Sequence, residues 1–435
     1  MRRTILLVFW MFLAVILIGE MAPAQTLPGE TPGEPQAQPV EGQIIPGEYI
    51  VVLKEDAPAS ARAANELAPR YGLDIQRTYQ SALKGFAARI PAGRLEAVKA
   101  DPRVLFVSQN RVFHVVSHRQ VADPVERIGG RESSARSGNG AGRVRAGVAV
   151  LDTGIDPRHR DLNVAGGVDC TSSGNDDGNG HGTLVAGMAA ARDNHFGVVG
   201  AAPGASLYAV KVLNDRGNGT LASILCGVGW VTANSEKVDV ANMSLTGSGF
   251  DDGECGREGG DALHFAICNS VEEGVTYVAA AGNSSENLKN STPAAYDEVL
   301  TVTAMTDTDS DPGGDGPRPA CEPYERDDTQ AYFSNFTTVG SDDAPHTIAA
   351  PGVCNRSTYP GNSYALSTGT SIASPLVAGT AALYKTSHPN ATPARVIERI
   401  RTQARQEPAR HGFDGDPRSP LRSRYYGYLV YAGDF

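Results

Sequence analysis

Short apolar runs alternate with longer helix-like segments through most of the chain. The runs are continuously apolar rather than alternating, as expected for strands buried on both faces of a sheet. The strand candidates are 146–151, 206–213, 238–243, 275–280 and 299–304, and the helix candidates are 183–191, 223–233, 262–273 and 371–388. This rhythm predicts an α/β domain over 121–435, with helices on both faces of a mostly parallel sheet and thus three layers.

A smaller pattern precedes this domain. Apolar, β-rich runs at 49–53, 86–90, 104–107 and 112–116 enclose two segments of helical composition, 59–71 and 94–100. Strands and helices that alternate within so short a stretch predict a small α+β sandwich over 46–118.

The first 45 residues form neither pattern. Arg2 and Arg3 precede an apolar run at 5–18, which ends before the small-residue sequence Ala22-Pro23-Ala24. This is the layout of a secretory signal peptide over 1–24, and the run is shorter than the roughly 18–20 residues that span a bilayer. Residues 25–45 are rich in Pro, Gly and Glu and predict a disordered linker. We therefore expect a secreted protein with no membrane attachment after signal cleavage.

Charge and cysteines narrow the function classes. The formal net charge of −11 argues against nucleic acid as a partner, since phosphate binding needs clustered Lys and Arg. Six cysteines in an exported chain indicate disulfides. The pairs nearest in sequence, Cys255 with Cys268 and Cys321 with Cys354, are the expected bridges, but six cysteines allow fifteen connectivities and the choice stays open.

Three short blocks carry candidate chemistry. Asp152 follows a strand in VAVLDTGID, His181 opens a small-residue helix in GNGHGTLVAG, and Ser371 opens another helix in GTSIASPLVAG. Taken singly, these are typical of a turn, a loop residue and a helix N-cap. Taken together, they supply a hydroxyl nucleophile, the imidazole base that it needs, and a carboxylate that orients the imidazole.

A fourth block, VAAAGNS, places Asn283 after another strand. Its side-chain amide could donate a hydrogen bond to an oxyanion, although an Asn after Gly is also common in turns. Ser371 at a helix N-terminus would add positive dipole at the same point. The neighbouring Asp176 and Asp177 resemble metal ligands, but a turn in a Gly-rich loop explains them better. The Gly-x-Ser-x-Gly elbow of α/β-hydrolases is absent from the sequence.

The order Asp, His, Ser and the four blocks resemble the subtilisin-like (subtilase) family of serine peptidases over about 121–405. Sedolisins share the fold but use Glu as base and Asp at the oxyanion, so His181 and Asn283 argue against them. Residues 46–118 are similar to the family's propeptide, an intramolecular chaperone and inhibitor. The segments PGEYIVVLK, LKGFAARI and VLFVSQNRVF carry that likeness.

The resemblance implies roles for further residues. The substrate cleft would be lined by Gly217, Asn218, Gly219, Ser244, Leu245 and Thr246, and the specificity pocket by Ala280, Ala281 and Gly282. Thr246 stands where many relatives have Gly, and its branched side chain would narrow the pocket or shift the edge of the cleft. Asp161 and Asn194 align with the family's ligands for a structural Ca²⁺, although solvated loop residues are the alternative. No cofactor is implied for catalysis.

These features predict a secreted serine endopeptidase that acts on proteins or peptides through an acyl-enzyme. It would be a monomer, made as a zymogen that cuts itself between about Val116 and Pro124 and is inhibited by its own propeptide. The alternative is a catalytically silent binding protein on the same scaffold. Residues beyond about 407 are expected to add a strand or to pack on the domain.

Overall fold

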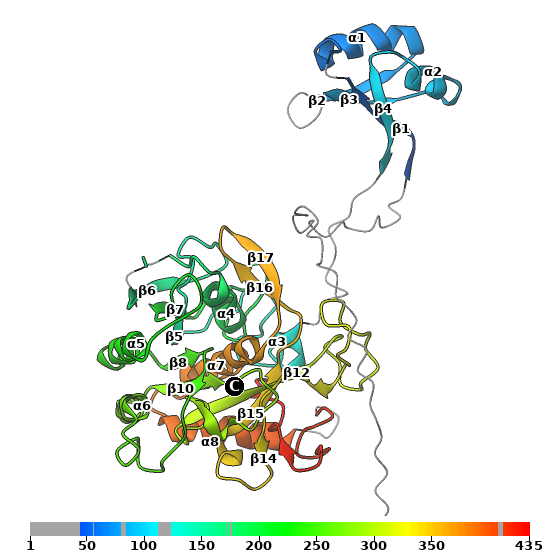
Figure 1. The fold of residues 1–435 in the computed structure, drawn as a ribbon. Coiled ribbons are helices and arrows are strands. Elements are labelled where there is room, and N and C mark those ends of the chain that lie inside the picture. Colours follow the sequence, from blue (N-terminus) through cyan, green and yellow to red (C-terminus); the bar gives the residue numbers. More distant parts are fainter. Residues whose placement is uncertain are drawn as a thin grey trace, which may run out of the picture. The chain divides into compact units, whose positions relative to one another are not determined.

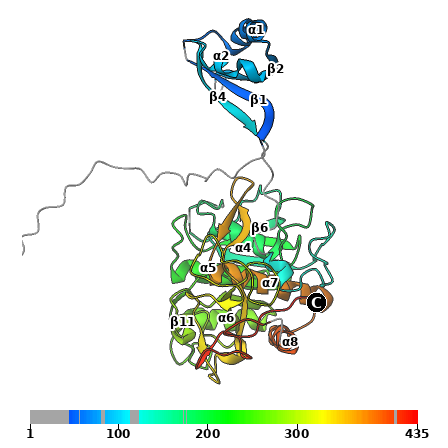
Figure 2. The same ribbon diagram turned by 90° about the vertical axis from the view of Figure 1, so that its right-hand side faces the viewer.

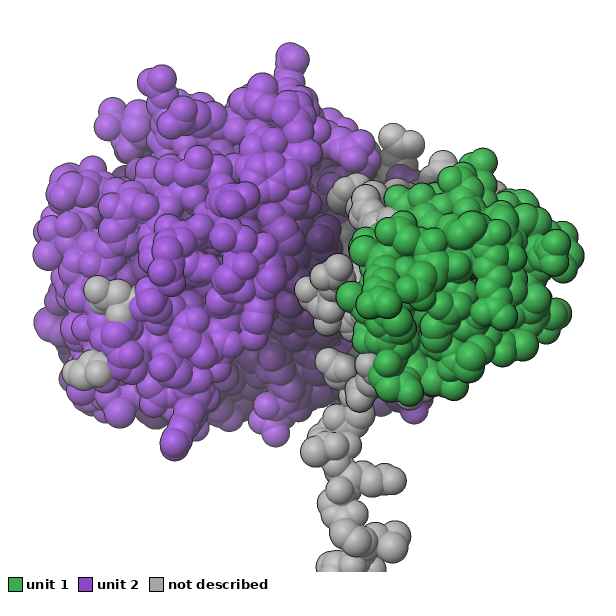
Figure 3. Space-filling view, turned by 90° about the horizontal axis from the view of Figure 1, so that it is seen from above, with its two compact units in different colours: residues 1–116 green, residues 117–435 purple. Residues whose placement is uncertain are grey.

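The computed structural model describes residues 44–54, 56–79, 84–111, 123–171, 173–174, 176–407 and 412–435. The predicted signal peptide, the linker up to residue 43 and most of the predicted maturation segment lie outside these residues. Contacts divide the chain into two compact units, 1–116 and 117–435 (Figure 3). No helix among the described residues is long and apolar enough to cross a membrane.

The N-terminal unit is a four-stranded antiparallel sheet with two helices. The strand order is β2-β3-β1-β4. The elements are β1 (Ile44–Leu53), α1 (Ser60–Tyr71), β2 (Asp74–Tyr79), β3 (Gly85–Arg89), a 3₁₀ turn (Ala92–Arg94), α2 (Leu95–Lys99) and β4 (Val104–Arg111). Val51, Phe86, Leu67 and Val98 form its core. The sequence did not predict β2, because this edge strand, DIQRTY, is mostly polar. The predicted strand at 112–116 lies outside the described residues.

The larger unit is built on a twisted sheet of eight strands (Figure 1). Its order is β13-β12-β10-β8-β5-β7-β6, and β15 also pairs with β12. All pairs are parallel except β12 with β13. The strands are β5 (Gly147–Asp152), β6 (Val164–Asp169), β7 (Ser206–Lys211), β8 (Val240–Met243), β10 (Thr276–Ala280), β12 (Val299–Thr306), β13 (Thr329–Gln330) and β15 (Thr347–Pro351). All five predicted strands are therefore present.

Two layers of helices enclose this sheet (Figure 2). Val148 and Val150 of β5 pack in one core with α4 and α7, while Ala149 and Leu151 pack in a second core with α5 and α6. The helices are α3 (Pro124–Arg127), α4 (His181–Ala190), α5 (Leu221–Ala233), α6 (Ala262–Glu272), α7 (Thr370–Ser387) and α8 (Pro393–Gln406). Because successive residues of a strand face opposite sides, this division confirms the three-layer α/β prediction.

Several elements were not predicted. β6 contains two glycines and lies at the sheet edge, and the hairpin of β16 (Asn355–Tyr359) and β17 (Ser363–Ser367) is largely polar. Periodicity gives little signal for such strands. Short pairs complete the unit: β9 (Gly247–Ser248) with β11 (Ser291–Thr292), and β14 (Thr337–Thr338) with β18 (Arg424–Tyr425). Two 3₁₀ turns span Leu288–Asn290 and Ala344–His346.

The C-terminal tail does both things that the sequence suggested. Its residues Arg424–Tyr425 form strand β18, and Tyr426, Leu429 and Phe435 are buried in the core that contains α4 and α7. The tail therefore forms part of the larger unit.

Three disulfides are present, and no described cysteine is free. The two bridges expected from sequence, Cys255–Cys268 and Cys321–Cys354, are confirmed. The remaining pair, Cys170–Cys226, joins residues 56 positions apart and ties the end of β6 to α5.

Candidate active site

The candidate catalytic residues lie at one edge of the sheet because parallel strands end there together. Asp152 is the last residue of β5 and stands in register with Lys211, the last residue of β7. Met243 ends β8 in register with Ala279, next to the end of β10. Asn283 follows β10, and His181 and Ser371 lie in the first turns of α4 and α7. Carboxyl ends of strands are where open α/β sheets place ligands.

Asp152 and His181 form a close pair. The Nδ1 atom of His181 lies 2.8 Å from Oδ1 of Asp152, whose side chain is fully buried, while the His181 side chain is 28% exposed. The Thr153 N–H donates to the same carboxylate oxygen at 2.7 Å. The negative charge of Asp152 raises the pKa of His181, and burial of the ring opposes that shift. One ring nitrogen is thus held by a carboxylate and the other, Nε2, is left for a reacting group.

Asp177 organises the start of α4. Its Oδ1 accepts hydrogen bonds from the Thr153 hydroxyl and the Gly180 N–H, and its Oδ2 accepts from the N–H and hydroxyl of Thr183. Its charge also raises the pKa of His181. The sequence suggested only a turn at Asp176 and Asp177. The carboxylate of Asp177 instead joins the residue after Asp152 to the helix that carries His181.

Ser371 and Asn283 face a common space. A methyl carbon placed on Gly369 would lie 3.0 Å from Oγ of Ser371 and 3.2 Å from Nδ2 of Asn283. The Asn283 carbonyl oxygen accepts from the Thr370 N–H at 2.9 Å and from the Thr370 hydroxyl at 2.8 Å. These bonds fix the amide, so its Nδ2 points to the space beside Ser371. Glycine at 369 leaves that space open.

The hydrogen bonds of the described residues do not include one between Ser371 Oγ and His181. Such bonds are often long in a free enzyme and tighten when substrate binds. The structure therefore brings His181 to Asp152 and Asn283 to Ser371 directly, and places both pairs at the same edge of the sheet.

A chain of buried polar side chains supports the first turn of α7, which carries Ser371. The Ser244 hydroxyl donates to the main-chain oxygen of Ser371 at 2.8 Å and accepts from Nδ2 of Asn242 at 2.9 Å. The Asn242 carbonyl oxygen accepts from the Ser374 hydroxyl at 2.7 Å. Ser244 was expected at the substrate cleft. Its hydroxyl links the first turn of α7 to β8, and its place at the cleft stays a prediction.

The other expected cleft residues follow strand ends. Gly217, Asn218 and Gly219 lie exposed between β7 and α5, and Thr246 lies exposed after β8 with Leu245 half-buried beside it. Ala280, Ala281 and Gly282 are buried. Gly282 has a φ of 103°, and a Cβ there would lie 2.5 Å from Nδ2 of Asn335, so only glycine fits.

Lys211 was not identified from the sequence. Its side chain is 1% exposed, and its ammonium donates to the Thr153 main-chain oxygen at 2.6 Å and to Asp215 at 2.7 Å. The signal was present as a lysine inside the apolar run SLYAVKVL. Its place beside Asp152 became visible only through the register of β5 and β7.

The predicted calcium ligands Asp161 and Asn194 do meet, but as hydrogen-bond partners. Asp161 accepts from the Asn194 amide at 2.8 Å, from the Tyr364 hydroxyl at 3.1 Å and from the Val198 N–H at 3.1 Å. Ca²⁺ takes oxygen ligands, whereas here the Asn194 amide turns its N–H, not its oxygen, toward Asp161. Calcium at this pair therefore stays a prediction.

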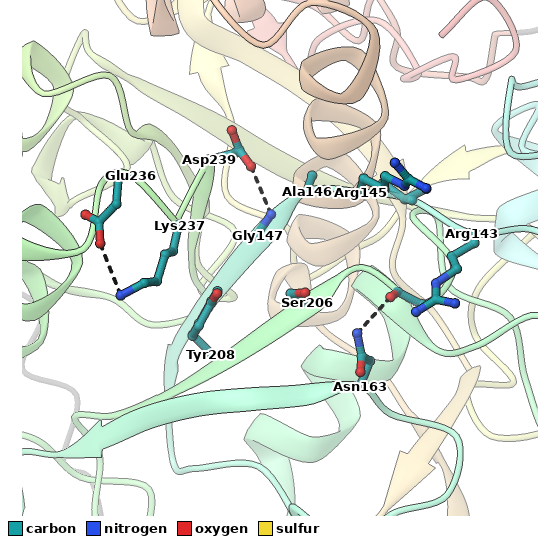
Figure 4. A pocket seen from close by; sticks show the side chains of 12 residues that line it. Arg143, Arg145, Ala146, Gly147, Asn163, Ser206, Tyr208, Glu236, Lys237 and Asp239 are labelled. Atoms are coloured by element: carbon teal, nitrogen blue, oxygen red, sulfur yellow. Dashed lines mark hydrogen bonds and ion pairs between the residues drawn. The ribbon is translucent and has the colours of Figure 1, made fainter.

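A pocket lies at the opposite edge of the sheet (Figure 4). Gly147 and Ser206 begin β5 and β7 and line it together with Arg143, Arg145 and Asp239. The Asp239 carboxylate is engaged by the Gly147 N–H at 2.9 Å. Since the candidate catalytic residues lie at the carboxyl ends of these strands, this pocket is no part of their site.

The fold and the placement of Asp152, His181, Ser371 and Asn283 at one edge of the sheet are those expected of a serine hydrolase. Comparison with known proteins agrees. The Subtilase family profile matches residues 145–428, and that of peptidase inhibitor I9 matches residues 48–115. Subtilisin DY of Bacillus licheniformis is 41% identical over 59% of this chain and 82% of its own. Subtilisin NAT of Bacillus subtilis subsp. natto is 34% identical over 82% of this chain and 84% of its own.

A thermostable alkaline protease of Halalkalibacterium halodurans is 34% identical over 85% of this chain and 89% of its own. The chain therefore belongs to the subtilase family and carries an inhibitor I9 domain at its N-terminal side. It is a serine endopeptidase made as a zymogen.

Proposed function

We propose that Asp152, His181 and Ser371 are the catalytic triad of this secreted endopeptidase and that Asn283 is its oxyanion donor. The observation that carries the proposal is the 2.8 Å pair of His181 with buried Asp152, at the same sheet edge as Ser371 and Asn283. Such a pair sets the tautomer of the imidazole and stabilises the imidazolium that forms when a proton is taken up.

The reaction is acyl transfer. Ser371 Oγ attacks a peptide carbonyl carbon while His181 Nε2 takes the hydroxyl proton. The carbonyl oxygen becomes an oxyanion, which receives hydrogen bonds from Nδ2 of Asn283 and from the Ser371 N–H at the start of α7. His181 then gives the proton to the leaving amine, and a water molecule, activated by the same ring, hydrolyses the ester.

Substrate recognition is proposed to rest on main-chain pairing. Gly217–Gly219 and Leu245–Thr246 lie on two segments that leave the sheet beside the catalytic residues. An extended peptide that adds to such segments is held through backbone hydrogen bonds, which accept many side chains. Buried Ala280, Ala281 and Gly282 would form the wall of the specificity pocket, with Thr246 at its rim.

The inhibitor I9 domain is proposed to inhibit the peptidase within the same chain. Self-cleavage after this domain is the proposed maturation step. Leu105 and Phe106 of β4 are 59% and 54% exposed, which leaves apolar surface on the domain's edge strand. We further propose that the protein is a secreted monomer that acts on proteins or peptides. No observation favours the silent binding protein, because each residue type that the chemistry needs is present.

Labelling with a serine-directed phosphonofluoridate tests the proposal. We expect one adduct per chain on the peptide that contains Ser371, and none in His181→Ala, because the ring activates the hydroxyl. Ser387→Ala is the matched control, since this exposed serine at the far end of the same helix bonds to the Tyr384 main-chain oxygen and should not affect labelling. An adduct on another serine, or equal labelling of His181→Ala, would contradict the assignment.

A further inference from the structure

His264 lies in a small acidic cluster away from the catalytic residues. It sits in the first turn of α6, its side chain is 1% exposed, and its ring stacks on Tyr296 at 4.1 Å between centroids. The segment before α6 is closed onto the helix by the Cys255–Cys268 disulfide. The ring is therefore fixed in position by packing on one side and by a covalently closed loop on the other.

The two ring nitrogens of His264 have different surroundings. Nε2 lies 2.9 Å from Oε2 of Glu298, a hydrogen bond. Nδ1 is buried and has no hydrogen-bond partner among the described residues. It points to Oδ1 of Asp251 and Oδ1 of Asp252, each 3.7 Å away. These two distances are too long for hydrogen bonds.

This arrangement needs a positive charge, either on the ring itself or between the ring and the two aspartates. If Nε2 carries the proton donated to Glu298, the lone pair of Nδ1 faces two carboxylate oxygens, an unfavourable contact unless a positive charge lies between them. No ion pair of the described residues joins a Lys or Arg to Asp251, Asp252 or Glu298. Backbone N–H groups of Glu254, Gly256 and Gly259 donate hydrogen bonds to the Asp252 carboxylate and hold it in place.

We propose that Asp251, Asp252 and His264 form a structural binding site for a divalent transition metal ion such as Zn²⁺. The three donor atoms lie within 4.8 Å of one another. A tetrahedral zinc ion with bonds of about 2.1 Å places neighbouring donors roughly 3.4 Å apart, so the 3.7 Å separations need only a small contraction.

The surroundings match those of known metal sites. The bond from Nε2 to Glu298 is the carboxylate–histidine–metal arrangement that orients a ligand ring and raises its basicity. The Gly253 and Asp297 N–H groups hold the Asp251 carboxylate at 2.6 and 2.9 Å. One imidazole with two carboxylates suits zinc better than calcium, which takes mainly oxygen ligands. The ion would clamp the loop after β9 to α6.

The competing occupant is a proton. An imidazolium would place its positive charge beside the carboxylates of Glu298, Asp251 and Asp252 and satisfy the same charge balance. A proton and a metal ion exclude each other on Nδ1.

The test uses full-length Ser371→Ala protein, which avoids self-digestion. After treatment with a chelator, it is dialysed against Zn²⁺ at about pH 7.5 and its metal content is measured. We expect His264→Gln and Asp251→Asn each to bind one zinc per chain fewer than the parent. Asp251 is partly exposed, so its variant guards against misfolding of His264→Gln. Asp309→Asn, in a separate cluster of carboxylates alone, is the matched control and should bind as the parent does.

Two further readouts separate a metal site from general stabilisation. Glu298→Gln should weaken zinc affinity about 10–100-fold, as loss of an outer carboxylate does. Zinc should raise the melting temperature of the parent and of Asp309→Asn, but not that of Asp251→Asn. Equal zinc content in the parent, His264→Gln and Asp251→Asn would overturn the proposal and leave His264 as a protonated, buried ion-pair partner.

Discussion

The Asn283 side chain is held through its oxygen by Thr370, which donates both its main-chain N–H, at 2.9 Å, and its hydroxyl, at 2.8 Å. The same hydroxyl accepts from the Gly282 N–H at 3.1 Å. One residue next to Ser371 thus fixes the amide that is proposed to receive the oxyanion. Orientation matters here because a donor stabilises the transition state only if it already points at the developing charge.

Asn283→Leu should lower kcat about 10²–10³-fold with little change in KM, since its amide acts on the oxyanion. That figure comes from subtilisin itself and is carried over to this relative. Thr370→Val keeps the main-chain bond to the amide but removes the hydroxyl bond, together with the acceptor of the Gly282 N–H, and should cost about tenfold or less. Steady-state hydrolysis of a peptide substrate measures both. Thr380→Val, a buried hydroxyl farther along α7, should leave kcat unchanged; a loss equal to that of Thr370→Val would refute the orienting role.

Asp177 links the pH profile to the start of α4. The charges of Asp152 and Asp177 raise the pKa of His181, and only the neutral ring acts as a base, so activity rises with pH through that pKa. Asp177→Asn removes one of these charges and should move the acidic limb of kcat/KM to lower pH. Asp176→Asn is the control, since this exposed neighbour is not among the causes of the shift. An unmoved limb in Asp177→Asn would mean that this carboxylate acts on structure alone.

The inhibitor domain should be sensitive to acid through Asp101. Arg103 lowers the pKa of this buried carboxyl to about 2, with hydrogen bonds of 2.9 and 3.0 Å. A lowered pKa stabilises the folded state above the unfolded value of about 3.9, and the contribution is lost as pH falls toward about 2.

Asp101→Asn in full-length Ser371→Ala protein should therefore speed hydrogen exchange in residues 44–111 at neutral pH, and the difference should shrink near pH 2. Asp74→Asn, at an exposed position of β2, serves as the control. If Asp101→Asn exchanges like its parent at neutral pH, the buried pair adds no stability.

The disulfides should differ in their contribution to stability. Cys170–Cys226 closes a separation of 56 residues and Cys255–Cys268 one of 13. The loop-entropy relation gives about 4 kcal/mol for the longer loop and about 3 kcal/mol for the shorter. Urea unfolding of paired Cys→Ala variants, in the Ser371→Ala protein, should show the larger loss for Cys170 with Cys226. The reverse order would indicate that strain or residual structure outweighs loop entropy.

The candidate site residues could be predicted where the signal lies within a short stretch of sequence. Asp152, His181, Asn283 and Ser371 each stand in a short block at a strand end or a helix start, and parallel strands bring such ends together. The sequence alone indicates only a turn at Asp177, because its partners, Thr153 and Thr183, become neighbours only when β5 and α4 pack. The periodicity of hydrophobic residues along the chain carries no information about such contacts.

The same limit applies to the rest of the fold. β5, β8 and β10 were predictable because burial on both faces makes them continuously apolar. The edge strands β2 and β6 were not, since their polar or glycine-rich residues meet solvent. The His264 cluster also escaped the sequence, because Asp251, Asp252 and Glu298 are joined through a loop closure and the start of β12.

The intact mass of the secreted protein, compared between the unmodified chain and Ser371→Ala, tests the central claim most directly. We predict that the unmodified chain loses about its first 115–123 residues, while Ser371→Ala keeps its inhibitor domain, because Ser371 is the nucleophile that makes the cut. Identical processing of both proteins in a host without other proteases would contradict Ser371 as the nucleophile of maturation.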